Sequence, residues 1–260
     1  MPSASQRDVP TLRATLREEW LDLQRWAATL NDADWSARSV IDGWTVRELV
    51  THLAVGMGAL INAETAAPST RALTPNEWFG FASMFAEGIA EGARQRTRDE
   101  PDTPRLLAST WAEAEAALGA AGDADHVAAV RTLATRWSDL IATRILEIVV
   151  HTDDLNRSLP QLQRAASKDA QRVAVRTLLD MLAERVPGKA VEVRVPPFAA
   201  IQCIEGPRHS RGTPPNVVEI DPWTWIRIAC GRMDWDQALS SHAVQASGAR
   251  ADLSDHLPLL

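Results

Sequence analysis

The chain has 260 residues, of which 45% are hydrophobic and 23% are charged, so it can bury one large core or two smaller ones. Its formal net charge of -7 argues against a nucleic-acid-binding protein, because contacts to phosphates require clustered cations. No segment approaches the roughly 20 apolar residues of a membrane-spanning helix, and the N-terminal "MPSASQRDVP" lacks the apolar core of a signal peptide. We therefore expect a cytoplasmic protein.

Apolar residues recur at helical spacing through most of the first half of the chain. This pattern predicts helices at about 9–30, 46–65, 75–97 and 104–119, followed by a segment at 127–158 that is mostly helical. Clusters of Asn, Asp, Ser, Gly and Pro separate these segments and indicate loops. The first half is therefore predicted to be all-α.

The second predicted helix has a clear start signal. Thr45 followed by Glu48 forms a capping box, and Trp44 before the cap is placed to pack on Leu49 as a hydrophobic staple. His52 borders the apolar stripe of this helix, and its neighbours along the helix surface are small. A ligand or another side chain can therefore approach His52 closely.

The pattern changes near Pro160. One amphipathic helix at 168–185 is followed by four short strand-like runs, with the helical segment "PWTWIRIACGRM" between the third and fourth. This order predicts a separate, smaller α+β domain. We place the helical domain at 1–160 and the α+β domain at 167–260. Cys203 and Cys230 lie in apolar contexts, which favours buried, reduced thiols over a disulfide framework or a catalytic cysteine.

The segment "RILEIVVHTDDL" (144–155) carries polar residues within an otherwise apolar helix. On a helical wheel its apolar residues cover roughly 220°, wider than the stripe that a surface helix buries. The remaining arc holds Thr143, Arg144, Glu147, His151 and Asp154. This polar stripe either faces water, where a Glu–His pair contributes about 0.3–0.5 kcal/mol, or faces the interior of a helical bundle and forms a metal site.

A third donor from another helix favours the metal site. His52 can join Glu147 and His151, and two imidazoles with one carboxylate suit zinc or another divalent first-row metal. Three protein ligands leave one coordination position open, as catalysis requires. Of the other histidines, His126 and two near the C-terminus, His242 and His256, are expected on the surface.

Two motifs together resemble a known family. "DGWTVRELVTHLA" (42–54) and "TRILEIVVHTDDL" (143–155) resemble the N-terminal domain of mycothiol-dependent maleylpyruvate isomerases, which are DinB-like metal-binding four-helix bundles. The resemblance covers about residues 9–159 and implies a four-helix bundle whose metal ligands are His52, Glu147 and His151. It places Arg144 and Asp154 beside the ligands, where they orient them or pair with Glu147; the alternative for both is an ion pair on the helix surface.

The second half resembles a bacterial sterol-carrier-protein-type domain, through its "DPWTW" helix start, its "GRMDW" turn and its final "LPLL". In the isomerases this domain closes over the metal site and contributes to the substrate pocket. The loop "CIEGPRHSRGTPPN" departs from the general pattern. It brings together Arg208 and Arg211, which are expected either to bind an anionic cofactor or ligand or to lie in a solvated loop.

The resemblances imply an enzyme that depends on a divalent metal, in the first place Zn²⁺, and on mycothiol as thiol cosubstrate. A metal-activated thiolate would add to a small electrophilic, anionic substrate, as an isomerase or an S-transferase. The competing prediction is a non-catalytic, lipid-binding carrier with a structural or vestigial metal site. Its apolar tunnel would be lined by residues that otherwise form ordinary core: Phe198, Trp223, Trp225, Ile226 and Ile228. We expect a monomer or homodimer without nucleic-acid or membrane partners.

Overall fold

The computed structural model describes residues 8–67, 69–206 and 215–260. The chain divides into two compact units, Met1–Ala170 and Gln171–Leu260, so the division lies just beyond the segment 160–167 in which the sequence pattern changes. Among the described residues, no helix is both long enough and apolar enough to cross a membrane.

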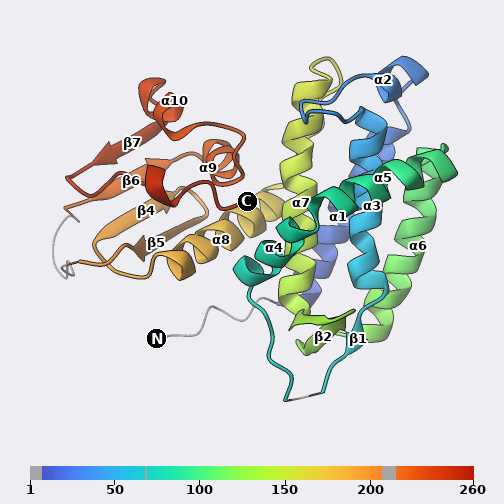
Figure 1. Cartoon of the computed structure of the whole chain (residues 1–260), viewed down its shortest axis with the longest axis horizontal. Coiled ribbons are helices and arrows are strands. Elements are labelled where there is room, and N and C mark those ends of the chain that lie inside the picture. Colours follow the sequence, from blue (N-terminus) through green and yellow to red (C-terminus); the bar gives the residue numbers. More distant parts are fainter. Residues whose placement is uncertain (1–7, 68, 207–214) are drawn as a thin grey trace. The chain divides into compact units, whose positions relative to one another are not determined.

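Four long helices form the first unit (Figure 1): α1 (Val9–Ala27), α3 (Val46–Ile61), α6 (Thr103–Ala121) and α7 (Trp137–Ser158). Each packs against two of the others, in the cyclic order α1, α7, α3, α6. This arrangement is the predicted four-helix bundle, and its interior is filled by large apolar side chains such as Trp20, Leu49 and Ile141.

Shorter elements connect the bundle helices: α2 (Asp32–Ser36), α4 (Pro75–Met84), α5 (Ala86–Asp99), β1 (Glu64–Thr65), β2 (Val127–Val130) and β3 (Leu133–Arg136). Helix α5 packs on α3, and α4 contacts α7. In Figure 1, α4 and α5 cross the bundle helices obliquely, and β1 and β2 lie at one end of the bundle.

Three predicted helices differ from the structure. The helix predicted over 46–65 ends at Ile61, and Glu64–Thr65 form strand β1. Residues 127–136 form the antiparallel hairpin β2–β3 rather than helix, so α7 begins only at Trp137. The hairpin turns at Arg131, whose φ of 54° is usually adopted by Gly or Asn, and the sequence therefore lacks the ordinary turn signal. The segment predicted as one helix over 75–97 is interrupted at Phe85, where the backbone leaves helical geometry without Gly or Pro.

The second unit is α+β, as predicted. Helix α8 (Lys168–Arg185) leads into a four-stranded sheet of order β5-β4-β6-β7, formed by β4 (Val191–Val195), β5 (Ala199–Cys203), β6 (Val217–Ile220) and β7 (Val244–Ser247). Strands β4 and β6 are parallel and the other pairs are antiparallel. Helices α9 (Pro222–Ala229) and α10 (Trp235–Ser240) lie between β6 and β7, and a short 3₁₀ helix, Ser254–His256, follows β7.

Most residues proposed for an apolar tunnel belong to the core of this unit. Phe198, Trp225, Ile226 and Ile228 are buried, whereas Trp223 is partly exposed. Both cysteines are also buried, and neither forms a disulfide. Burial raises the pKa of the Cys203 thiol to about 11, so this thiol stays protonated at neutral pH and does not act as a nucleophile.

Candidate metal centre

The packing of α3 against α7 brings two predicted ligands together. The imidazole rings of His52 and His151 lie perpendicular to each other, with their centroids 5.2 Å apart. The polar stripe of α7 is largely buried, since the exposed fractions of Arg144, His151 and Asp154 are 6%, 8% and 0%. The Glu147 side chain in the same stripe is 21% exposed, so most but not all of the stripe is shielded from water.

His151 is held in one orientation by a carboxylate. Its Nδ1 donates to Asp154 Oδ2 at 3.0 Å, and Asp154 Oδ1 accepts from Arg157 Nη2 at 2.5 Å. Arg157 also pairs through Nε with Asp153 at 3.1 Å. An imidazole that donates through Nδ1 keeps the lone pair of Nε2 available, and this carboxylate–histidine arrangement is typical of metal-binding histidines.

His52 is half-buried and its ring is neutral at neutral pH. Desolvation, followed by the charge of the neighbouring His151, lowers the pKa of His52 from 6.5 to about 4. Its Nδ1 atom is buried without a hydrogen-bond partner among the described residues. Leaving a buried nitrogen unsatisfied costs about 1–3 kcal/mol, and such groups in native proteins usually mark a function or an absent ion.

The carboxylate of Glu147 lies in the same stripe but pairs with an arginine. Arg144 Nη1 contacts Glu147 Oε2 at 3.0 Å and also donates to the carbonyl oxygen of Gly56 on α3 at 3.0 Å. Arg144 thus bridges the two helices and holds Glu147. Within the described ranges, no group of three or more His, Cys, Asp or Glu side chains is arranged to hold a metal ion.

The chemistry of the donor set nevertheless fits a divalent metal. It combines two imidazoles, one neutral with an unsatisfied nitrogen and one oriented by Asp154, with the Glu147 carboxylate one helical turn before His151. Nitrogen donors with one carboxylate suit zinc and its neighbours in the first row better than calcium or magnesium. Assignment of His52, Glu147 and His151 as ligands therefore remains a proposal that this chemistry supports.

Gly56, which sequence reasoning noted only as a small neighbour of His52, lets the two helices approach. A Cβ atom at this position would lie 2.9 Å from Glu147 Oε2 and 3.1 Å from Arg144 Nη1. A Cβ at Gly58, two residues further along α3, would meet only Asn62 Nδ2, at 3.7 Å. Gly56 and Gly58 therefore offer a test position and a control position on the same helix.

We expect Gly56→Ala to displace the Arg144–Glu147 pair and to weaken zinc binding. Its gain in helix propensity is offset by the close contacts, so the free energy of unfolding should stay within about 1 kcal/mol of the wild-type value. Gly58→Ala should instead raise the stability by about 0.5–1 kcal/mol and leave zinc affinity unchanged. Urea unfolding and zinc titration calorimetry test this, and identical behaviour of the two variants would contradict it.

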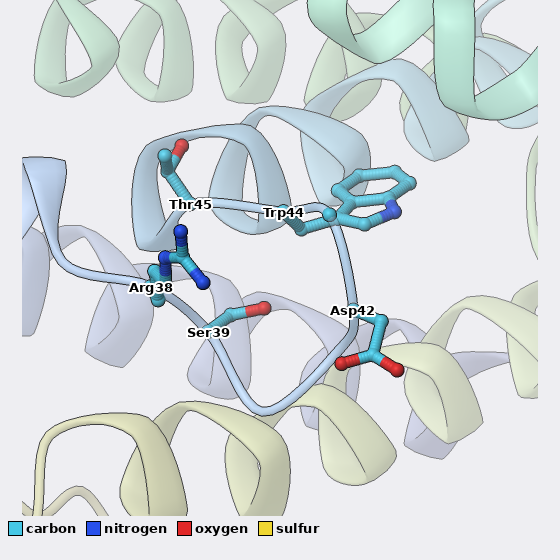
Figure 2. A pocket seen from close by; sticks show the side chains of 6 residues that line it. Arg38, Ser39, Asp42, Trp44 and Thr45 are labelled. Carbon is cyan, nitrogen blue, oxygen red and sulfur yellow. The ribbon is translucent and has the colours of Figure 1, made fainter.

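A small pocket lies in the loop before α3. Its volume is about 320 Å³, and it is lined by Arg38, Ser39, Asp42, Gly43, Trp44 and Thr45. Figure 2 shows Arg38, Ser39 and Thr45 on one side of this loop, and the Trp44 ring and Asp42 carboxylate on the other. Trp44 also contacts His52, with the ring centroids 5.5 Å apart, so one side chain joins the pocket to the candidate metal centre.

Sequence reasoning missed two further residues of this region. Arg157 lies three residues after Asp154 and four after Asp153. On a helix this spacing places opposite charges side by side, so the ion pairs could have been predicted from the sequence. Trp44 was assigned only to the hydrophobic staple, and nothing in its spacing indicates the contact with His52. Of the other predicted site residues, Arg208 and Arg211 lie outside the described residues.

Comparisons with known proteins agree with the fold. Residues 16–156 match the family described as the mycothiol maleylpyruvate isomerase N-terminal domain, and residues 167–259 match the bacterial SCP ortholog family. A crystal structure of the mycothiol-dependent maleylpyruvate isomerase is similar, with a TM-score of 0.56, 17% sequence identity and coverage of 92% of each chain. The structure of an H52A mutant of that enzyme gives 0.57, 18% and again 92% of each chain. A comparison with curated proteins found no match.

Proposed function

Because the chain belongs to the mycothiol maleylpyruvate isomerase N-terminal domain family, we propose that it is a metal-dependent enzyme that adds the thiolate of mycothiol to a small electrophilic substrate. The observation that carries the proposal is the contact between the imidazoles of His52 on α3 and His151 on α7, with a buried, unsatisfied nitrogen on His52. A structural helix contact has no need of two histidines in this arrangement.

In this proposal His52, His151 and Glu147 hold a divalent metal, of which Zn²⁺ suits the donors best. When bound, such an ion favours the thiolate form of an added thiol, which is the nucleophilic form. The buried thiol Cys203 and the buried Cys230 do not supply the nucleophile, so the thiol comes from outside the protein.

The polar residues of α7 position these donors. Asp154 accepts a hydrogen bond from Nδ1 of His151, which leaves the lone pair of Nε2 available to a metal. Arg157 balances the negative charge of Asp154. Arg144 holds Glu147 and anchors it to the Gly56 carbonyl group. These contacts fix side chains before a substrate arrives, which lowers the cost of assembling the reacting groups.

The reaction begins when the thiolate sulfur attacks an electrophilic carbon and forms a C–S bond. The π electrons of the attacked double bond move to the neighbouring atoms. In an isomerase the former double bond rotates, the C–S bond breaks again and the thiolate is released. In an S-transferase the adduct takes up the proton that the thiol gave up, and the thioether is the product.

The test is an activity screen of the full-length protein with mycothiol and a panel of small anionic electrophiles, with and without a chelator. We expect turnover that requires both the thiol and the metal, and mass spectrometry of the products separates isomers from thioethers. Absence of any thiol-dependent turnover, together with absence of stoichiometric metal in the purified protein, would contradict the proposal.

The match of residues 167–259 to the bacterial SCP ortholog family favours one alternative, a carrier of an apolar ligand. In that case native mass spectrometry of the purified protein would detect co-purified lipid. Stoichiometric metal without lipid supports the enzyme, whereas lipid without metal supports the carrier.

We expect Asp154→Asn to weaken zinc binding by about 10–100-fold, the usual effect of removing the partner of a ligating histidine. The amide keeps the shape of the carboxylate but loses the charge that stabilises the Nδ1–H form of His151. Asp153→Asn is the control, because Asp153 pairs with the same Arg157 and its loss removes an equal charge one residue away. Chelator competition measures both affinities, and equal losses would show that charge alone, and not the orientation of His151, matters.

A further inference from the structure

The two candidate histidine ligands are held in different ways. His151 has a carboxylate partner on its own helix, Asp154 at 3.0 Å. The structure shows no such partner at Nδ1 of His52, which is buried without a hydrogen bond to the described residues. Metal-binding histidines usually owe their ring orientation to such an outer hydrogen bond. A hydrogen bond at Nδ1 therefore does not orient the His52 ring, and its packing contacts gain importance.

Aromatic packing provides this interaction. The ring of Trp44 stands perpendicular to that of His52, at 86° with the centroids 5.5 Å apart, and the His151 ring is perpendicular to His52 as well, at 5.2 Å. Edge-to-face pairs in this distance range are favourable by about 0.5–1.5 kcal/mol beyond their burial. Two perpendicular neighbours restrict rotation of the His52 ring, although neither forms a hydrogen bond with Nδ1.

Trp44 is itself fixed from two sides. Its backbone N–H donates to the Ile41 carbonyl group at 3.2 Å, and its carbonyl group accepts from the Ser39 N–H at 2.9 Å. The guanidinium carbon of Arg94, on α5, lies 5.8 Å from the centroid of the Trp44 ring, within the range of a cation–π contact. Figure 2 shows the Trp44 ring projecting from the loop just before α3.

We propose that Trp44 is a positioning residue that orients the imidazole of His52, and that Arg94 holds Trp44 in place for this role. The proposal rests on the proposed function, in which His52 binds a metal. Packing against Trp44 orients the His52 ring, as the hydrogen bond to Asp154 orients the His151 ring. In this role Trp44 acts through the His52 ring, and Arg94 acts through Trp44.

The role of Arg94 predicts the direction in which metal affinity changes when this residue is removed. Removing a positive charge near a cation site favours metal binding on Coulombic grounds alone. If Arg94 acts by holding Trp44, its removal must instead weaken metal binding. Arg94 and Arg98, both on α5, pair with the same Glu91 at 3.7 and 2.7 Å. Arg98→Ala therefore removes an equal charge beside the same carboxylate and serves as the matched control.

The experiment measures zinc affinity by chelator competition for the full-length wild type, Trp44→Ala, Trp44→Phe, Arg94→Ala and Arg98→Ala. We expect a loss of about 10–100-fold for Trp44→Ala, recovery of most of that loss in Trp44→Phe, a loss of about 2–5-fold for Arg94→Ala, and no loss for Arg98→Ala. Thermal unfolding confirms that each variant is folded. If Trp44→Ala does not fold, Trp44→Phe and Arg94→Ala decide the outcome through the second measurement.

That measurement needs no metal. Long-range ¹H–¹⁵N spectra of the chelator-treated protein report the ring nitrogens of His52 and His151 separately. We expect the His52 signals to shift or broaden in Trp44→Ala, and to a smaller extent in Arg94→Ala and Trp44→Phe. The His151 signals should change less than those of His52, because Asp154 holds the His151 ring. Unchanged His52 signals and wild-type zinc affinity in a folded Trp44 variant would overturn the proposal, and tighter zinc binding by Arg94→Ala would overturn the role of Arg94. A wild type without zinc affinity would contradict the proposed function, while the spectra would still test the positioning role.

Discussion

Replacing either His52 or His151 with alanine is expected to abolish stoichiometric binding of a divalent metal. Each variant removes one of two imidazole donors, and the remaining imidazole and the Glu147 carboxylate cannot retain the ion. The loss should exceed the roughly 10–100-fold effect of removing an outer partner. Wild-type protein at a zinc concentration of about 100 times the dissociation constant gains roughly 2.7 kcal/mol of stability from zinc, and both variants should lack this gain.

Metal content of the purified proteins and thermal unfolding with and without chelator measure this effect. His126→Ala is the matched control, because His126 lies in the same unit but in neither α3 nor α7, and stacks on Trp137 with the ring centroids 5.5 Å apart. It should keep the wild-type metal content. Retention of metal by both His52→Ala and His151→Ala would show that the ligands are other residues.

The second large effect is expected on stability, from Arg164→Met. The Arg164 side chain is 2% exposed and pairs with Glu19, also 2% exposed, at 3.4 Å, and with Asp22 at 3.2 Å. Its Nη1 atom also donates to the Thr152 hydroxyl group. Removing one partner leaves the Glu19 carboxylate buried without its counter-charge, which costs about 3–5 kcal/mol. For a unit of this size the melting temperature should fall by about 6–20 °C.

Urea unfolding and calorimetry measure this loss. Arg17→Met is the control, because Arg17 lies on the same helix as Glu19 and forms an exposed pair with Glu115 at 3.2 Å, whose removal should cost under about 1 kcal/mol. The double variant Glu19→Gln/Arg164→Met should recover part of the loss, since no charge then stays buried without a partner. A loss for Arg164→Met no larger than that for Arg17→Met would contradict the structural role of the buried pair.

This network also shows where sequence patterns stop being informative. Residues 160–167 have the composition of a connection between domains, and Arg164 alone looks like a solvated linker residue. The structure instead buries Arg164 against α1 and α7, and Asn156 binds both its N–H and its carbonyl group. Periodicity describes which face of a helix is apolar, but a loop has no periodicity, so burial of its side chains depends on contacts that are distant in sequence.

The fold was predictable where local signals were strong. The capping box at Thr45 and Glu48 is present, with hydrogen bonds of 2.8 and 3.2 Å, and α3 begins where it predicts. In the second unit, β4 alternates between buried and half-buried residues, whereas β7 has one buried residue followed by three exposed ones. The hairpin β2–β3 was missed because its turn at Arg131 lacks the usual Gly or Asn, and neighbouring helical segments made the helical interpretation of 127–136 the simpler one.

For the candidate metal centre too, some features could be predicted from the sequence and others could not. The sequence by itself determined which residues of α7 share one face, because that follows from 3.6 residues per turn, and it identified His52, Glu147 and His151 as possible partners. Only the tertiary structure decided that most of this face is buried, that Arg144 joins Glu147 to the Gly56 carbonyl group of α3, and that Trp44 contacts His52 while Arg94 contacts Trp44. These outcomes depend on how α3, α5 and α7 pack, and packing is set by the shape and charge of surfaces that no single segment contains.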